Sequence, residues 1–520
     1  MLSLGAVARR AAQINPKGVA LIDEGRELTW GEFPDRLARL AGGLRGLGIE
    51  NGERAAILAL NSARYYEFYF ATAWAGGVFV PVNTRLAGPE IVHWLTDSGA
   101  RVVCVDATFL EQVQGLRDQL PELETIVYLG DDAPEGTVAW DALAERAPVE
   151  DAGRGGDDLA GLFYTGGTTG RSKGVMLSHQ NLVVNALQIA PILGVKRGDR
   201  LLHTAPMFHI ADWVICMSAA VAGGCNWFRP AFEPVDVMET IARERIQKLL
   251  MVPTMINMVA NHPALADHDL SSLERILYGA SPMPEAVIAK VLEVLPGVEM
   301  VQAYGQTEAA PCVTMLAPEY HTVDPASPFA GKLKSAGQAI PGVEVAVLDE
   351  NDQPVGVGEV GEVCCRGPNV MLGYRNLPEQ TEATLRNGWL HTGDGGRMDE
   401  DGFLFIVDRV KDMIVSGGEN VYSAEVENAL ASHPAVAQCA VIGVPDEKWG
   451  ERVHAIVFTK EGAEVSEQSI LDHCRGLIAG YKCPRSVTFR DEPLPLSGAG
   501  KILKTELRKP FWTGQARGVN

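Results

Sequence analysis

The chain has 520 residues, enough for roughly two to four domains, and its 46% hydrophobic and 21% charged residues exclude a disordered chain. Its 45 basic and 66 acidic residues give a net charge of −21. Because no run of Lys or Arg is longer than two, we expect no nucleic-acid partner.

The first half of the chain alternates helical and strand-like patterns. Thr29 and Glu32 have the spacing of a capping box, and apolar residues follow at helical intervals from Phe33. The patterns then predict a strand, a helix and two strands, at Arg54–Leu60, Arg64–Ala75, Val78–Val82 and Val102–Val105. Further strand-like runs follow Leu201 and lie near Leu249–Val252 and Arg275–Leu277. This alternation predicts βαβ units and a parallel sheet.

From Gly337 the pattern changes to short strands separated by Gly, Pro and Asp, which predicts an antiparallel or barrel-like module. The last hundred residues have their own periodicity, with helices and strands predicted at Ser423–Leu430, Ala437–Gly443, Val453–Phe458 and Glu467–Ala479. We therefore predict an α/β fold with a large N-terminal domain, residues 1–410, that ends in the barrel-like module. A small mobile α+β domain, residues 411–520, follows it.

The cysteine content and the hydropathy of the sequence indicate in which cellular compartment the protein is expected. The nine cysteines form no Cys-x-x-Cys pair, and the adjacent Cys364 and Cys365 lack a second pair to complete a zinc site. We expect buried, reduced thiols. The first twelve residues lack a signal-peptide pattern, and the most apolar stretches are shorter than the roughly 20 residues of a membrane helix. These features predict a cytoplasmic protein with no integral membrane segment.

The segment from Tyr164 to Gly174, YTGGTTGRSKG, carries the clearest chemistry. Its glycines let backbone N–H groups approach an anion closely, its threonines add hydroxyl donors, and Lys173 adds a positive charge. It is not a Walker loop, because Ser172 precedes Lys173. The alternative is a flexible surface turn, but the position between a predicted strand and helix favours a phosphate-binding loop.

This segment resembles the phosphate loop of the adenylate-forming superfamily, which contains acyl-CoA synthetases, nonribosomal adenylation domains and beetle luciferases. The family usually has Ser where this chain has Gly167. The resemblance implies that the loop binds the phosphates of ATP through Thr165, Gly166, Gly167, Thr168, Thr169 and Lys173.

Other segments match the family in the same order along the chain. In Tyr304-Gly305-Gln306-Thr307-Glu308, the resemblance implies that Tyr304 packs on adenine and that Glu308, with Thr168, holds Mg²⁺. It further implies nucleotide contacts from Gly279, Ala280, Ser281, Gly305 and Thr307, and ribose contacts from Asp394 and Arg409. Each segment alone would be read as an ordinary turn or a solvated side chain.

The C-terminal region carries the remaining matches. Gly500-Lys501-Ile502 resembles the family's late Gly-Lys-Ile segment, which implies that Lys501 bridges the substrate carboxylate and the α-phosphate of ATP. The hinge between the domains would lie at Lys411. The implied CoA-binding residues are Ser416, Gly417, Gly418 and Trp449.

Pro206-Met207-Phe208-His209 resembles a segment that borders the acyl site of acyl- and aryl-CoA ligases, and it implies a catalytic or gating role for His209. A lone histidine is otherwise a packing residue. The predicted acyl pocket comprises His209, Asp212, Trp213, Val252, Pro253 and Tyr278.

Together, the matches imply an acid–CoA ligase that uses ATP, Mg²⁺ and CoA. A carboxylic acid and ATP would give an acyl-adenylate and pyrophosphate, and CoA would then take the acyl group as a thioester. We expect a medium- or long-chain fatty acid as substrate, with a hydroxycinnamate or other aryl acid as the alternative. A luciferase-like oxidation, acyl transfer to a carrier protein and a non-catalytic nucleotide sensor are weaker alternatives. Family analogy also makes a homodimer an expectation.

Overall fold

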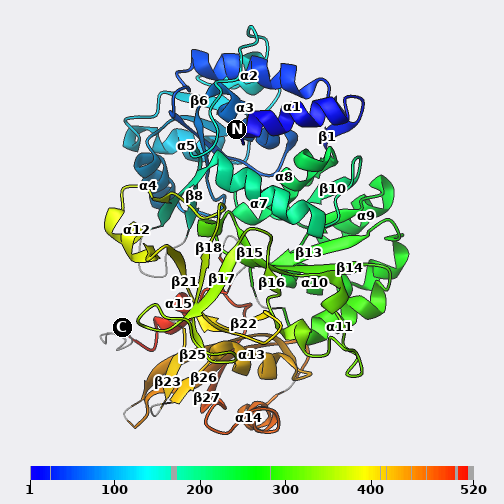
Figure 1. Ribbon diagram of the computed structural model, residues 1–520, viewed down its shortest axis with the longest axis vertical. Coiled ribbons are helices and arrows are strands. Elements are labelled where there is room, and N and C mark those ends of the chain that lie inside the picture. The colour runs from blue at the N-terminus through cyan, green and yellow to red at the C-terminus, as the bar shows by residue number, and fades with distance from the viewer. Residues whose placement is uncertain are drawn as a thin grey trace.

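Figure 1 shows a computed structural model of the chain. The structure describes residues 2–23, 25–165, 172–281, 283–409, 412–416, 419–446, 448–463, 465–497 and 502–512.

An eight-stranded sheet forms the first layer of the large domain. Its strands in spatial order are β19 (Gly373–Tyr374), β9 (Lys173–Ser178), β8 (Leu159–Thr165), β4 (Val78–Pro81), β3 (Arg54–Leu58), β5 (Ala100–Val105), β6 (Thr125–Tyr128) and β7 (Val138–Ala139). The strands from β8 to β7 run parallel, and β9 pairs antiparallel with both β8 and β19. The central strands are apolar on both faces because helices cover the parallel sheet on both sides.

A nine-stranded sheet forms the second layer. Its order is β16 (Gln338–Ala339), β15 (Cys312–Leu316), β14 (Glu299–Gly305), β13 (Arg275–Gly279), β12 (Lys248–Leu250), β10 (Arg200–His203), β11 (Cys225–Phe228), β1 (Val19–Asp23) and β2 (Arg26–Thr29). The strands from β14 to β1 are parallel, and the outer strands β15, β16 and β2 pair antiparallel. This arrangement confirms the predicted α/β class.

The helices of the large domain are α1 (Leu4–Ile14), α2 (Phe33–Gly46), α3 (Ala63–Ala75), α4 (Gly88–Ser98), α5 (Leu110–Leu116), α6 (Trp140–Leu143), α7 (His179–Ile192), α8 (Ile210–Ala222), α9 (Pro234–Glu244), α10 (Pro253–Ala260), α11 (Glu285–Val294) and α12 (Pro378–Thr384). Helices α7 and α8 pack against each other, and most of their residues are buried. They lie within one apolar core that joins the two sheets.

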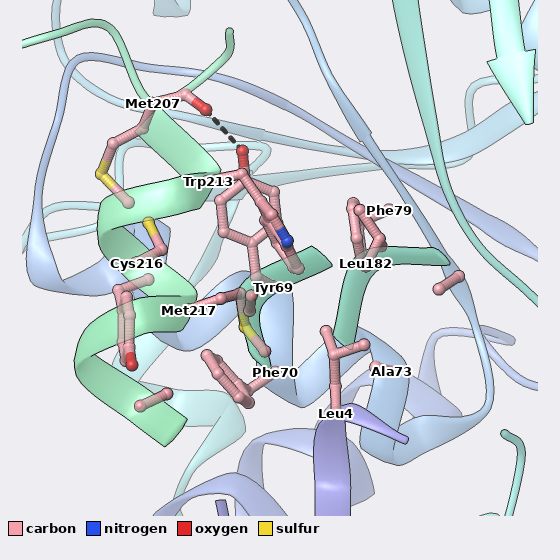
Figure 2. Packing of buried hydrophobic residues seen from close by; sticks show 14 of the residues in the cluster. Leu4, Tyr69, Phe70, Ala73, Phe79, Leu182, Met207, Trp213, Cys216 and Met217 are labelled. Carbon is pink, nitrogen blue, oxygen red and sulfur yellow. Dashed lines mark hydrogen bonds between the residues drawn. The ribbon is translucent and has the colours of Figure 1, made fainter. Parts of the chain in front are cut away.

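Aromatic side chains fill the part of this core beside α8. Tyr69 and Phe79 contact Trp213, with ring centroids 5.0 and 5.4 Å away, and the phenol of Tyr69 donates a 2.6 Å hydrogen bond to the carbonyl of Met207 (Figure 2). Since these rings are buried and interlocked, they hold the turn before α8 rigidly.

A five-stranded antiparallel sheet follows and confirms the predicted barrel-like module. It consists of β17 (Glu344–Leu348), β18 (Gly361–Arg366), β21 (Trp389–Met398) and β20 (Leu385–Arg386), with β22 (Leu404–Arg409) paired to β21. The sequence pattern had not predicted β21, because Gly, Asp and Thr interrupt its apolar alternation.

The small C-terminal domain lies at the lower end of the molecule, next to this module (Figure 1). Its sheet has the order β24 (Glu419–Val421), β23 (Ile414–Ser416), β26 (Gly450–Thr459) and β25 (Val436–Asp446), with β27 (Ser486–Arg490) on β26. The helices α13 (Ser423–Ala431), α14 (Glu467–Arg475) and α15 (Lys504–Arg508) complete it. The predicted boundary at residues 410 and 411 lies outside the described residues.

Several local predictions can be checked directly. Thr29 and Glu32 form the predicted reciprocal bonds: the backbone N–H of Thr29 donates to the Glu32 carboxylate at 3.0 Å, and that of Glu32 donates to the Thr29 hydroxyl at 3.3 Å. All nine cysteines are free thiols, and eight of them are buried. In the described part of the chain, no helix has the length and apolar character needed to cross a bilayer.

Candidate nucleotide and acid site

The carboxyl ends of β13 and β14 carry two of the predicted nucleotide-binding segments to one edge of the nine-stranded sheet. Gly279, at the end of β13, is in register with Ala303 on β14, just before Tyr304. In parallel α/β sheets, ligands bind at this edge. Ala280 follows with a positive φ of 65°, which is uncommon for a residue with a Cβ and typical of functional turns.

Two glycines at this edge have no room for a side chain. A Cβ on Gly279 would lie 2.3 Å from the carbonyl oxygen of Ala303. A Cβ on Gly305 would lie 2.0 Å from the carbonyl oxygen of Pro311, and Gly305 also has a φ of 156°. The backbone of these predicted nucleotide-binding residues is therefore tightly packed against its neighbours.

Tyr304 and Asp394 meet across two different sheets. The Tyr304 phenol donates a 2.8 Å hydrogen bond to Oδ2 of Asp394, a carboxylate in β21 that is only 6% exposed. The backbone N–H of Asp394 donates to the Thr392 hydroxyl at 3.1 Å, and that hydroxyl donates to the carbonyl of Val363 at 2.6 Å. Burial, followed by the charge of Asp394, raises the pKa of Tyr304 well above its usual value, so the phenol stays a hydrogen-bond donor.

Glu308 lies beside the phosphate-loop strands. It is 8% exposed, in the short 3₁₀ helix η3 (Thr307–Ala309), and the Tyr374 phenol donates a 2.8 Å hydrogen bond to its Oε1. The ammonium of Lys173 lies 4.6 Å from the Tyr374 ring centroid. Lys173 is itself in register with Thr165 across β8 and β9, the two strands that flank residues 166–171. A buried carboxylate thus lies close to the base of the predicted phosphate loop.

The C-terminal domain contacts the same side of the large domain. The Arg85 guanidinium, just before α4, donates a 3.0 Å hydrogen bond to the carbonyl of Ser497. On α4, Nε2 of His93 lies 3.3 Å from the carbonyl of Ser172, at the end of the predicted phosphate loop. The residue pair Leu496 and Ile502, which flanks residues 497–501, is held by an isolated bridge. Ser497, the last described residue before this gap, therefore contacts the large domain through Arg85.

Comparison with known proteins agrees with this geometry. The model of the AMP-binding enzyme family matches residues 8–375, and the model of the AMP-binding enzyme C-terminal domain matches residues 425–501. The chain belongs to the AMP-binding enzyme family. This membership confirms the predicted adenylate-forming superfamily and the predicted enzyme class, an AMP-forming acyl-CoA synthetase.

Relatives of the AMP-binding chain align with nearly its whole length. It is 41% identical to a feruloyl-CoA synthase of Amycolatopsis sp., over 98% of this chain and 99% of the relative. It is 37% identical to the long-chain-fatty-acid–CoA ligase FadD13 of Mycobacterium tuberculosis, over 98% and 99% of the two chains. Its fold matches the crystal structure of the anthranilate CoA ligase AuaEII with a TM-score of 0.89, 29% identity and coverage of 98% and 97%.

In this AMP-binding enzyme, the predicted acyl-pocket residues lie in several different surroundings. His209 caps the N-terminus of α8: its Nδ1 accepts the backbone N–H of Ala211 at 3.2 Å. Val252 is the N-cap residue of α10, without a side-chain capping bond, and Pro253 is the first residue of that helix. Trp213 belongs to the aromatic core of Figure 2. Their role in an acyl pocket stays a prediction.

Asp212 and Tyr278 have partners inside the protein. Oδ2 of Asp212 is 2.7 Å from Nδ1 of His203, and both side chains are buried. The Tyr278 phenol lies 3.0 Å from Nε2 of His321, within a second apolar core beside the nine-stranded sheet. Because burial lowers the pKa of His321 to about 4, its imidazole is neutral and accepts this hydrogen bond.

The predicted CoA-binding residues Ser416 and Trp449 come together in the C-terminal sheet. Ser416 is in register with Gly450, the residue after Trp449. Two cations, Lys448 and Arg485, lie over the Trp449 ring, 4.8 and 4.4 Å from its centroid. This cluster of one indole and two positive charges has the character of a site for a base with a neighbouring phosphate.

Other predicted residues lie outside the described part of the chain: Gly166, Gly167, Thr168, Thr169, Lys411, Gly417, Gly418 and Lys501. For Arg409, the structure gives the backbone, which pairs with Asp394 across β21 and β22. Sequence reasoning missed Tyr374, Arg85 and His93. No local motif marks them, because each acts through a contact with a residue far away in sequence.

Proposed function

We propose that this chain is an acid–CoA ligase that activates an aromatic, hydroxycinnamate-type carboxylic acid with ATP and then forms its CoA thioester. The observation that carries the proposal is the meeting of Tyr304 and Asp394 on one side of the site and of Glu308, Tyr374 and Lys173 on the other. Tyr304 and Asp394 have the chemistry to bind a nucleoside. Lys173 can bind a polyphosphate, and Glu308 can bind the metal ion that accompanies it.

In the adenylation step, Asp394 accepts hydrogen bonds from the ribose hydroxyls while Tyr304 holds that carboxylate in place. Lys173 and the loop beside it neutralise the phosphates, and Lys501 stabilises the charge that develops as two anions meet. A carboxylate oxygen attacks the α-phosphorus, the bond between that phosphorus and the bridging oxygen breaks, and pyrophosphate leaves. No nucleophilic side chain is needed.

The residues at Glu308 fit a magnesium ion. Its buried carboxylate offers the hard oxygen that Mg²⁺ prefers, close to the base of the phosphate loop, and Thr168 would add a hydroxyl. When bound, Mg²⁺ neutralises phosphate charge. Tyr374 would orient the carboxylate toward this role through its 2.8 Å hydrogen bond.

In the second step, the CoA sulfur attacks the acyl carbonyl, and the carbon–oxygen bond to AMP breaks. The indole of Trp449, flanked by Lys448 and Arg485, supports CoA as acceptor, because it can stack on adenine while the cations attract a phosphate. We infer that the C-terminal domain turns about Lys411 between the two steps, taking Lys501 away from the reacting phosphate.

Two observations support an aromatic acid. The feruloyl-CoA synthase relative is 41% identical, against 37% for the fatty-acid ligase FadD13. In addition, interlocked rings at Tyr69, Phe79 and Trp213 pack behind the turn that carries Met207, two residues before His209 in the sequence (Figure 2). A rigid wall of this kind suits a short, flat acid better than a long flexible chain.

A medium- or long-chain fatty acid is the second candidate, and the FadD13 relative favours it. The experiment that separates the two is ATP-dependent AMP formation with CoA across two panels, saturated fatty acids of rising length and aromatic acids from benzoate to ferulate. We expect the highest kcat/KM among the aromatic acids. An optimum among the fatty acids would replace the aromatic proposal, and AMP release without any CoA thioester would overturn the ligase proposal itself.

A further inference from the structure

Three potential metal ligands converge at a place that the proposed reaction does not use. Glu362 and Cys364 lie two residues apart on β18, so their side chains share one face of the strand. His391 on β21 is in register with Cys364. One ligand atom from each residue lies within 4.8 Å of the other two. The cysteine pair alone had excluded a zinc site, but pairing of the two strands supplies the missing ligands.

The distances suit a single small cation. Nδ1 of His391 lies 2.8 Å from Oε2 of Glu362 and 3.3 Å from Sγ of Cys364. In a tetrahedral zinc site with bonds of about 2.0–2.3 Å, neighbouring ligand atoms are about 3.4 Å apart. The three atoms therefore need only small adjustments to bind one ion.

Protons alone cannot give both Glu362 and Cys364 a hydrogen bond to the same ring nitrogen, Nδ1 of His391. One ring nitrogen holds at most one proton, so Nδ1 cannot donate to Glu362 and also accept from the Cys364 thiol. If Nδ1 accepts from the thiol, two acceptors face each other at 2.8 Å. If it donates to Glu362, the buried sulfur loses its acceptor on the ring. A cation among the three atoms removes this conflict.

The second ring nitrogen of His391, Nε2, gives an independent indication of a metal site. His391 is 6% exposed, and its Nε2 has no hydrogen-bond partner among the described residues. The nearest carboxylate oxygen, Oδ1 of Asp352, is 3.7 Å away. Metal-binding histidines typically direct their second nitrogen at such a carboxylate. Small movement of Asp352 would complete that arrangement.

We propose that Glu362, Cys364 and His391 bind a divalent transition metal of the zinc class, with Asp352 orienting the imidazole from its far side. Thiolate and imidazole are ligands that Zn²⁺ prefers, whereas Mg²⁺ and Ca²⁺ take oxygen ligands. On binding, the sulfur–metal bond replaces the S–H bond, and the proton goes to solvent. Arg386, 3.5 Å from Glu362, has a side chain 40% exposed and can turn outward as the ion enters.

The site is structural in character and adjoins the ribose segment. It joins β18 to β21, and the other oxygen of Glu362, Oε1, accepts the backbone N–H of Gly393 at 3.0 Å. Gly393 directly precedes Asp394. A metal at this position would therefore hold the strand that presents Asp394, without contacting the nucleotide.

The test uses Co²⁺ as a probe with the metal-stripped full-length protein. We expect one equivalent of Co²⁺ to give a thiolate-to-cobalt charge-transfer band in the near ultraviolet and Zn²⁺ to displace it. Cys364→Ser should abolish the band. The matched control is Cys365→Ser, because Cys365 points to the opposite face of β18, into the main core, and should keep the band. Absence of the band, or its persistence in Cys364→Ser, would overturn the proposal.

A second measurement does not depend on the cysteine variant folding. Asp352→Asn should weaken Zn²⁺ binding about ten- to a hundredfold, as loss of such an outer carboxylate does in other sites. Asparagine tolerates the positive φ of 58° at this position. His391→Gln should remove the rise in Tm that Zn²⁺ gives the parent protein. Equal Zn²⁺ affinity in all variants would contradict the assignment, and it would leave the proposed ligase activity untouched.

Discussion

The Tyr304 phenol donates a 2.8 Å hydrogen bond to a carboxylate 90 residues further along the chain, that of Asp394. The two residues come from different sheets, the nine-stranded sheet and the antiparallel module that follows it. This contact joins the end of β14 to the middle of β21, so the module holds one wall of the proposed nucleotide site in place.

We expect Tyr304→Phe to raise the KM for ATP about tenfold, because a hydrogen bond to a charged group contributes about 1.5–3 kcal/mol. The ring, and with it most of the packing, is kept. The measurement is ATP-dependent pyrophosphate exchange over a range of ATP concentrations. Tyr320→Phe is the control, since Tyr320 packs edge-on against Phe329 and Phe403. An unchanged KM in Tyr304→Phe would contradict the proposed role.

Glu308→Gln should lower the adenylation rate by at least a hundredfold, because the variant loses the charged oxygen proposed to hold Mg²⁺. Tyr374→Phe keeps that carboxylate and removes only its 2.8 Å hydrogen bond. For this second variant, we expect a higher Mg²⁺ concentration at half-maximal rate with a smaller loss of kcat. Measuring the adenylation rate over a range of Mg²⁺ concentrations, at saturating ATP, distinguishes the effect of Glu308→Gln from that of Tyr374→Phe. A Tyr374→Phe variant with the parent's Mg²⁺ dependence would show that the phenol does not orient Glu308.

Lys501→Ala should abolish pyrophosphate release but spare the formation of thioester from supplied acyl-adenylate and CoA. The reason is that Lys501 is proposed to act only where the two anions meet. Each half-reaction is measured separately, with Lys460→Ala, an exposed lysine of the same domain, as control. Equal loss of both halves would remove the assigned role.

Trp449→Ala should raise the KM for CoA about tenfold and leave pyrophosphate exchange unchanged. Loss of a stacking and cation–π surface removes about 1–2 kcal/mol of binding. Arg485→Gln, which keeps the indole but removes one of the flanking cations, should give a smaller rise. The measurement is thioester formation at varied CoA. A parallel loss of adenylation in Trp449→Ala would point instead to a folding defect of the C-terminal domain.

The stability of the fold should fall between pH 6.5 and pH 4 partly through His321. Burial lowers the pKa of this imidazole to about 4, against about 6.5 in the unfolded chain. The unfolded state therefore binds a proton that the folded state excludes, and stability falls by about 1.4 kcal/mol for each pH unit below 6.5. His321→Gln should make the drop in Tm from pH 7 to pH 5 smaller. If the Tm of His321→Gln falls as much as that of the unmodified protein, other titratable groups cause the loss of stability at low pH.

Much of the fold could be predicted from periodicity. The local pattern was sufficient to predict the reciprocal bonds of Thr29 and Glu32, because these residues are close in sequence. It was sufficient for the strands β3, β4 and β5 for the same reason. The strand β21 was missed because Thr392, Gly393 and Asp394 break the apolar alternation. Their conformation depends on pairing with β18 and β22 rather than on local preference.

Some residues of the candidate site could likewise be predicted from the sequence, and others could not. Tyr304, Glu308, Lys173 and Asp394 were predicted because each belongs to a short motif that resembles a segment of the family, in the same order along the chain. Tyr374 was not, because it reaches Glu308 from a two-residue strand with no such motif. For Asp212 and Tyr278, the family resemblance led us to predict a place in the acyl pocket, but only the structure shows the direction of the side chains, toward His203 and His321.

The sequence by itself determined the α/β class, the family and the identity of the motif residues, since these depend on short-range pattern and on local chemistry. Only the tertiary structure decided which motifs touch one another: Tyr304 with Asp394, Tyr374 with Glu308, and Cys364 with Glu362 and His391. The physical reason is that these contacts form between strands distant in sequence, and their register is set by the packing of whole sheets rather than by the residues that meet.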